Sequence, residues 1–266
     1  MCNLNILFKN KKAKHKDLLT AFNFSCAASY AMNTDGAGVY FNNGNKLVTS
    51  ANNIDINKYK NNFINSSVVI GHERISTSGH SLDNLQPFMN ERFVFVHNGV
   101  LYEFNNHKEK SDSKQLFEVF IRNFSLTNDV AIAIKQALKT EGGSYSILIY
   151  DKKEEIGYYF KNGATSISFY AGEGILFIST KDNNKYFFSD LKEVKIKSYN
   201  IYKIENLNVK CVGTIDYKDP YEKFDWKQSY GNRYTKRKHI DNVQKYYDDM
   251  EEYDLKYTKK IADYNV

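Results

Sequence analysis

The chain of 266 residues has few of the residues that mark disulfide-stapled, multidomain or membrane proteins. Its three cysteines are an odd number without paired spacing, which argues against a disulfide scaffold and favours a reducing compartment, so we expect a cytoplasmic protein. Two prolines and no Pro/Gly-rich linker leave no obvious internal boundary. No apolar run reaches the roughly 18 residues of a membrane span, and the start of the chain lacks the features of a signal peptide.

The excess of positive charge is also small. The chain has 37 basic and 31 acidic residues, a formal charge of +6 that does not require an anionic partner. The basic runs 9–12 and 233–238 match no recognisable nucleic-acid-binding fold, so we favour solvated charge there. With 42% apolar and 15% aromatic residues, the composition is that of a folded globular protein. The length suits one domain and is tight for a two-domain synthetase.

The pattern of residues 2–215 predicts one α+β domain. Two helices, at 111–123 and 129–140, carry apolar residues at three- and four-residue steps. The strands follow one another in hairpin-like succession, which favours an α+β sandwich over a doubly wound parallel sheet. The nine predicted strands are 4–8, 38–42, 67–75, 93–96, 145–151, 157–161, 166–170, 175–179 and 201–204.

Residues 216–266 differ in character from the rest. A charged, aromatic loop comes first, and the following segment predicts an amphipathic helix with Val243, Tyr246, Met250, Tyr253 and Ile261 on one face. Such a helix can pack on its own domain or on a sister subunit of a homo-oligomer. It can also dock a partner enzyme, and the sequence leaves these uses open.

Polar residues gather in segments 71–79, 86–88 and 96–100, where predicted strands end. Each has an ordinary explanation when taken alone. Asn98-Gly99 after a β-rich run is typical of a turn, an arginine at a strand end is usually solvated, and an acid at position 112 can cap a helix. Together with a cysteine at position 2, however, the cluster indicates a single site.

In this order the residues resemble the class II glutamine amidotransferase domain, an N-terminal-nucleophile (Ntn) hydrolase. The resemblance implies a four-layer αββα sandwich and needs no cofactor. The landmarks that carry it are Met1-Cys2, Asp35-Gly36-Ala37-Gly38, Gly71-His72-Glu73-Arg74-Ile75-Ser76-Thr77, Gln86-Pro87-Phe88, His97-Asn98-Gly99 and Ser111-Asp112-Ser113.

The chemistry of amide cleavage gives Cys2 a role of its own. Removal of Met1 would leave Cys2 with a free α-amine, whose pKa of about 7.7–8.0 allows a neutral fraction to accept the thiol proton. Base and nucleophile would then share one residue, so no His or Asp partner is needed. The predicted reaction forms a γ-glutamyl thioester on Cys2 and yields glutamate and ammonia.

The resemblance also implies roles for other members of the cluster. Asn98, through its side-chain amide, and Gly99, through its backbone N–H, would stabilise the oxyanion. His72 and His97 flank these positions, and we expect mainly structural, hydrogen-bonded roles for both. A metal site is not favoured, because the histidines of residues 72–97 lack the spacing of metal ligands.

The α-carboxylate and α-ammonium of L-glutamine each need a partner, because a buried unpaired charge is costly. Arg74 fits the carboxylate. By resemblance, Thr77 and Ser78 would add donors, and Asp112 would take the ammonium.

Four positions depart from the family pattern. They are Asn3 in place of a glycine after the nucleophile, Ser78 in place of histidine, Glu103 without the common asparagine, and Lys114 in place of an acid. None of them touches the nucleophile or the oxyanion pair. A positive Lys114 that pointed inward would weaken ammonium binding by Asp112.

The destination of the ammonia is open. Class II domains usually deliver it to a fused synthase, and the roughly 50 residues that follow the predicted domain are too few for one, so we expect a separate acceptor enzyme. Two alternatives remain. One is an Ntn amidohydrolase that acts on a different γ-glutamyl or acyl amide, and the other is a catalytically silent module that binds a partner.

Overall fold

The computed structural model describes residues 2–13, 18–76, 81–104, 109–139, 142–180 and 191–216. All of these lie in the first of two compact units, Met1–Lys223, and are described by themselves. The predicted C-terminal helix lies outside the described residues. Within the described ranges, no helix combines the length and apolar character that a membrane crossing requires.

The first of two antiparallel sheets has seven strands. They are β1 (Asn3–Lys9), β2 (Ala37–Phe41), β3 (Lys46–Ser50), β4 (Val68–Glu73), β9 (Ser168–Gly172), β10 (Ile175–Ser179) and β11 (Lys192–Glu193). Their order is β11-β9-β10-β1-β4-β2-β3, so β1 lies in the middle of the sheet between β10 and β4. A central strand has both backbone edges paired, which fixes the start of the chain firmly.

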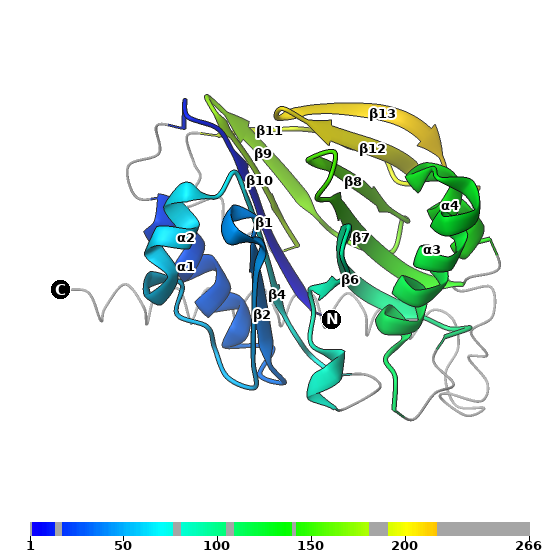
Figure 1. Ribbon diagram of the computed structural model, residues 1–266, viewed down its shortest axis with the longest axis horizontal. Helices are drawn as coiled ribbons and strands as arrows, with labels where there is room; N and C mark the ends of the chain where they lie inside the picture. Colours follow the sequence, from blue (N-terminus) through cyan, green and yellow to red (C-terminus); the bar gives the residue numbers. More distant parts are fainter. Residues whose placement is uncertain are drawn as a thin grey trace, which may run out of the picture. The chain divides into compact units, whose positions relative to one another are not determined.

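The second sheet has six strands. They are β5 (Phe88–Met89), β6 (Phe93–Leu101), β7 (Gly143–Asp151), β8 (Ile156–Lys161), β12 (Asn200–Glu205) and β13 (Asn208–Thr214). They follow the order β13-β12-β8-β7-β6-β5. Figure 1 shows β6 and β7 of this sheet beside β1 and β4 of the first.

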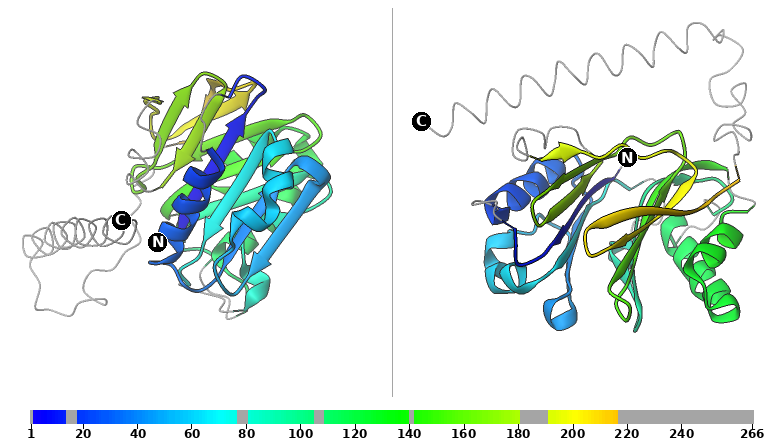
Figure 2. Two further views of the ribbon diagram at one scale, coloured as in Figure 1. Left: turned by 90° about the vertical axis from the view of Figure 1, so that its left-hand side faces the viewer. Right: turned by 90° about the horizontal axis from the view of Figure 1, so that it is seen from above.

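Helices lie on the outer side of each sheet (Figures 1 and 2). The four α-helices of the described residues are α1 (Leu18–Tyr30), α2 (Lys60–Asn65), α3 (Asp112–Thr127) and α4 (Val130–Ala137). Short 3-10 turns connect the strands at Asn43–Asn45 (η1), Ile56–Tyr59 (η2) and Leu82–Asn84 (η3).

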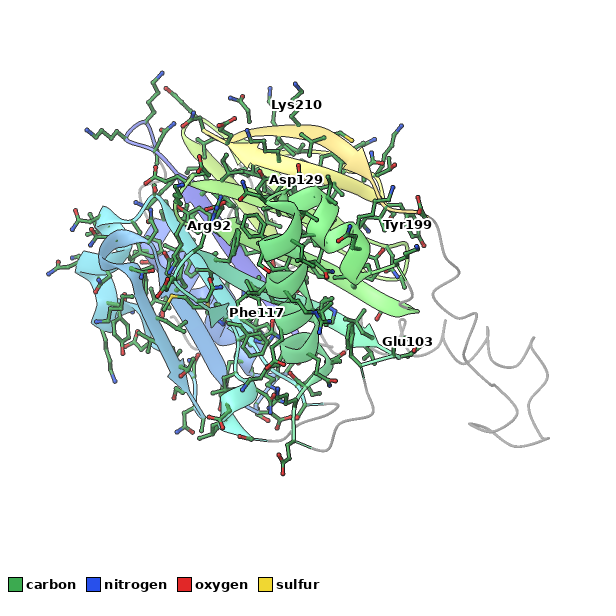
Figure 3. All side chains as sticks on the ribbon, turned by 45° about the vertical axis from the view of Figure 1, so that its right-hand side comes forward. Arg92, Glu103, Phe117, Asp129, Tyr199 and Lys210 are labelled. Carbon is green, nitrogen blue, oxygen red and sulfur yellow. The ribbon has the colours of Figure 1, made fainter. Side chains whose placement is uncertain are left out.

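Three hydrophobic cores hold these elements together. The first packs α1 and α2 on the first sheet, through side chains such as Phe22 and Phe63. The second lies between the two sheets. The third packs α3 and α4 on the second sheet, where the ring of Phe117, labelled in Figure 3, stacks on Phe88 with centroids 6.0 Å apart. Alternation along the central strands β1, β2, β4, β6, β7 and β10 sends successive side chains to different cores, which is why nearly every residue of these six strands is buried.

All nine predicted strands and both predicted helices are present, with bounds shifted by a few residues. The sequence patterns missed α1, however. Its buried stripe includes Ser25, Cys26 and Ser29, so the apolar period of a helix is interrupted by polar residues that pack inward.

The prediction also ended the strand at 93–96 too early. In the structure β6 continues to Leu101, through the His97-Asn98-Gly99 segment. Gly99 adopts φ +145°, and a Cβ there would clash with the backbone oxygen of Ser144. The Asn-Gly pair therefore lies inside a paired strand and not in a turn, and only glycine fits at its second position.

Candidate active site

Strand alternation turns one set of side chains of the first sheet toward the second sheet. Leu4 of β1 and Ile70 of β4 belong to the core between the sheets. Cys2 lies two residues before Leu4, so its side chain points to the same side of the sheet. His72 and Arg74 follow Ile70 at steps of two and point to that side as well. The register, which pairs Leu4 with His72, brings the start of β1 beside the end of β4.

The second sheet presents Asn98 to the same space. Val96 of β6 packs in the core between the sheets, and Asn98 follows it on the same face. Its register partner on β7 is Ser146, whose hydroxyl lies 2.9 Å from the Tyr159 hydroxyl. We call the side chains that face one another here, Cys2, His72, Arg74 and Asn98, the inter-sheet site.

Cys2 carries a thiol that donates to the backbone oxygen of Ile75 over 3.4 Å. Burial raises the pKa of this thiol, while the hydrogen bond to Ile75 and the positive charges of the chain N-terminus and Arg74 act in the opposite direction. A thiol with a raised pKa is a poor nucleophile until a base removes its proton, so any reaction at Cys2 requires a base close by.

Arg74 is 4% exposed at the end of β4. Burial lowers the pKa of its guanidinium, and the electrostatic influence of Cys2, Asp35 and Asp112 acts in the opposite direction. Asp35 also holds the backbone here, because its Oδ2 accepts from the N–H of Ser76 at 2.7 Å. The guanidinium therefore lies within the electrostatic reach of both the thiol and the acid at the start of α3.

Asp112 is buried at the first residue of α3. It is not the helix cap, because the Ser111 side chain caps the helix by accepting from the N–H of Lys114. Asp112 instead accepts from the N–H of Leu101 at 2.9 Å and of Ser113 at 2.8 Å. These two bonds tie the acid to the end of β6 and so fix where its charge lies.

Lys114 points away from this acid. Its ammonium donates to the backbone oxygen of Asp83 in η3 at 3.1 Å. Because its ammonium is directed to Asp83, Lys114 is not expected to repel a cation bound at Asp112.

His97 lies on the opposite face of β6, toward α3. Its Nδ1 is 2.8 Å from the hydroxyl of Ser113, and its Nε2 is 3.5 Å from the backbone oxygen of Ser144. Burial lowers the pKa of His97, against the opposing effects of Asp112 and the Ser144 carbonyl. This hydrogen-bonded histidine joins the strand that carries Asn98 to the helix that carries Asp112.

Gln86 fixes the same strand from the other side. Its Oε1 accepts from the N–H of His97 at 2.6 Å, and its Nε2 donates to the carbonyl of His97 at 3.2 Å. The side chain thus replaces a neighbouring strand at one residue, which holds the peptide before Asn98 in place.

A second polar cluster lies behind the first sheet, against α1. We call Asn5, Ser25, Ser29, Glu73 and Ser179 the α1-side cluster. The Oδ1 of Asn5 accepts from the hydroxyls of Ser25 (2.5 Å) and Ser179 (3.2 Å), and its Nδ2 donates to Ser29 (3.1 Å) and Glu73 (2.9 Å). The sequence analysis overlooked this cluster, although asparagine at an inward position of an apolar strand is a usable signal for a buried hydrogen-bonded group.

The other two cysteines contrast with Cys2. All three thiols are free. Burial, with the charge and hydrogen bond of neighbouring Glu73, raises the pKa of Cys26 well above its ordinary value. Cys211 is exposed on β13.

Some predicted positions cannot be placed. Thr77, Ser78 and His80 lie outside the described residues. Among those that are described, no group of three or more His, Cys, Asp or Glu side chains could hold a metal ion.

A cavity of about 660 Å³ opens at the opposite end of β1 from Cys2, lined in part by Lys9, Glu155 and Glu205.

Known proteins are similar in sequence to this chain. No family model matches the chain. It is 26% identical over 201 residues to an amidophosphoribosyltransferase of Pyrococcus horikoshii, covering 69% of this chain and 44% of that protein. It is 29% identical over 134 residues to a glutamine–fructose-6-phosphate aminotransferase of Helicobacter pylori, covering 44% and 22%. Over these residues the chain is similar in sequence to glutamine amidotransferases of the N-terminal-nucleophile type. It spans less than half the length of these two relatives.

The fold of this chain has solved counterparts. The glutamine phosphoribosylpyrophosphate amidotransferase from B. subtilis, solved with ADP and GMP, superposes with a TM-score of 0.59 at 16% identity, over 80% of this chain and 49% of that one. At this identity the likeness establishes the fold, an α+β arrangement with two antiparallel sheets.

Proposed function

We propose that the chain hydrolyses the side-chain amide of L-glutamine through a γ-glutamyl thioester on Cys2, after removal of Met1, and releases glutamate and ammonia. The observation that carries the proposal is the inter-sheet site. Two sheets bring a thiol, a buried guanidinium and a side-chain amide to facing surfaces, with the fixed charge of Asp112 close to Arg74. These are the groups that amide cleavage of an amino-acid side chain requires.

The proposed first step uses the amine and thiol of Cys2. The neutral α-amine accepts the thiol proton, and the sulfur attacks the amide carbon of glutamine. Negative charge develops on the carbonyl oxygen and is stabilised by the Asn98 side-chain amide and the Gly99 backbone N–H. The amine then returns the proton to the leaving nitrogen, ammonia departs, and water hydrolyses the thioester to glutamate.

The remaining charges of glutamine have proposed partners. Arg74 pairs with the α-carboxylate and Asp112 with the α-ammonium, while Thr77 and Ser78 add donors at the carboxylate. The mutual electrostatic influence of Arg74 and Asp112 supports this assignment, because a zwitterion of glutamine's size needs both signs within a few ångströms.

The finer architecture is part of the proposal. Three cores separated by two sheets support a four-layer αββα sandwich of the Ntn-hydrolase type over residues 2–215. Residues 216–266 would then form the charged loop and amphipathic helix, used for a homo-oligomer or a partner. In this scheme the cytoplasmic protein supplies ammonia to a separate synthase.

Intact-mass analysis tests the chemistry directly. Purified protein is measured before and after treatment with a γ-electrophilic glutamine analogue, alongside Cys2→Ala. We expect loss of Met1 and one adduct, mapped by peptide mass to Cys2, absent in Cys2→Ala and suppressed by excess glutamine. Cys26 serves as an internal control because its buried, raised-pKa thiol should not react. Retained Met1, or an unlabelled Cys2 in folded protein, would support a catalytically silent module instead.

The same labelling distinguishes substrates. Arg74→Ala and Asp112→Ala should each abolish protection by millimolar glutamine, because each removes the partner of one substrate charge. If protection and hydrolysis survive both changes, the substrate is a different γ-glutamyl or acyl amide.

A further inference from the structure

Two side chains of the inter-sheet site hold polar atoms that are buried without a hydrogen-bond partner. Among the residues that the structure describes, the only such atoms are Nδ1 and Nε2 of His72 and Oδ1 of Asn98. His72 is 0% exposed and Asn98 is 3% exposed. A buried polar group without a partner costs about 1–3 kcal/mol, so these orphans require an explanation.

The alternation along β4 and β6 directs both side chains toward the same core. Both face the space between the sheets, His72 from β4 and Asn98 from β6. Burial, the positive charge of Arg74 and the neighbouring imidazole of His97 lower the pKa of His72 to about 3, and the backbone carbonyls of His97 and His72 act in the opposite direction. The carbonyl of His97 belongs to the peptide bond that leads into Asn98, so the imidazole lies against the backbone of the oxyanion residue.

Resting on the proposed function, we propose that His72 is a positioning residue that orients the side-chain amide of Asn98 by donating a hydrogen bond to its Oδ1, directly or through one water molecule. A neutral imidazole has one N–H donor. An Asn98 amide whose oxygen is held by this donor turns its NH₂ group away from His72 and toward the carbonyl of glutamine. Without the donor, the amide can present either end, and its oxygen would repel the oxyanion.

A double-mutant cycle tests whether His72 acts through Asn98. His72→Leu should lower kcat for glutamine hydrolysis about 10- to 100-fold with less than about a threefold change in KM, because orientation of an oxyanion donor matters in the transition state. His72→Gln, which keeps an N–H donor, should recover most of kcat. In an Asn98→Ala background, His72→Leu should have no further effect on kcat.

Val96→Ala is the matched control. Val96 is buried in the core between the sheets, two residues before Asn98 on β6. Its side chain cannot donate a hydrogen bond. Its effect on kcat should be the same in both backgrounds. If His72→Leu is also equally harmful in both backgrounds, the histidine acts only through packing and the proposal is wrong.

A second measurement does not depend on activity. The side-chain NH₂ signals of Asn98 are assigned by NMR from their absence in Asn98→Ala, and are then compared between wild type and folded His72→Leu. We expect a clear shift in wild type relative to His72→Leu, and matching signals would overturn the inference. If wild type neither hydrolyses glutamine nor labels at Cys2, the proposed function fails, and this spectrum still decides whether His72 contacts Asn98.

Discussion

The two faces of the first sheet carry polar residues that differ in how completely they are paired. On the α1 side, Asn5 uses both ends of its amide in four hydrogen bonds. On the inter-sheet side, His72 and Asn98 keep buried atoms without partners among the described residues. The polar side chains of both clusters are deeply buried, since Asn5 and His72 are 0% exposed and Asn98 is 3% exposed, so burial does not explain the difference. A network in which every polar group is hydrogen-bonded stabilises the fold. Buried polar atoms without a hydrogen-bond partner are available to bind a ligand.

Asn98→Ala should separate these two roles most sharply. We expect a loss of about 10²–10³ in kcat, the usual cost of one oxyanion donor. The free energy of unfolding should fall by no more than about 1.5 kcal/mol, the net contribution of the one hydrogen bond that we propose between His72 and Asn98. Glutaminase assays and urea denaturation measure the two quantities. A near-wild-type rate would remove Asn98 from the mechanism.

Asn5→Leu should show the opposite pattern. Loss of the central amide removes one hydrogen bond each from the carboxyl of Glu73 and from three hydroxyls, so we expect about 1–3 kcal/mol lower unfolding free energy. Activity per folded molecule should fall much less than in Asn98→Ala. Asn208→Leu, at an exposed position of β13, is the control and should change stability by less than about 0.5 kcal/mol. Equal stability of the two variants would mean that the α1-side cluster is not a stabilising network.

The pH dependence of stability gives a smaller effect. The pKa of His72 is lowered to about 3, so between that pH and the ordinary value of about 6.5 the unfolded chain binds a proton that the folded chain does not. Unfolding free energy should therefore fall as pH falls below about 6.5, by up to about 1.4 kcal/mol per pH unit from this group. His97, whose pKa burial also lowers, adds with the same sign.

His72→Gln removes one of these two contributions. Its unfolding free energy should decline less steeply than that of wild type between pH 6.5 and 5, a window above the titration of most carboxyl groups. Denaturant curves at three pH values are sufficient to measure the slopes. Identical slopes would show that His72 is protonated to the same extent in both states.

Much of the fold could be predicted because apolar alternation is strong in this chain. Strands such as Leu4–Phe8 and Ile175–Ser179 have nearly continuous β-forming residues, and the structure places them within one or two residues of the prediction. The helix α1 could not be found in this way, since Ser25 and Ser29 interrupt its buried stripe. Those serines face inward only because Asn5 is there to bond them, and that partner comes from a distant part of the chain.

The candidate site could likewise be predicted only in part from the sequence. The residue types and their order at Cys2, Arg74, Asn98 and Asp112 carried the resemblance to class II glutamine amidotransferases. That resemblance implied glutamine chemistry and a role for each residue, and these roles stay predictions. From the sequence we expected the same structural, hydrogen-bonded role for His72 and His97. In the structure His97 has Ser113 as a partner, whereas His72 has none among the described residues.

The sequence by itself determined which groups exist and which face of each strand they occupy, since a period of two residues follows from covalent geometry. It also set the charge pattern and the glycine that lets β6 run through position 99. Only the tertiary structure decided which atoms are left unpaired, because pairing depends on elements far apart in the chain. The register of β1 against β4, and the packing of β6 across from them, direct Cys2, His72 and Asn98 toward the space between the two sheets.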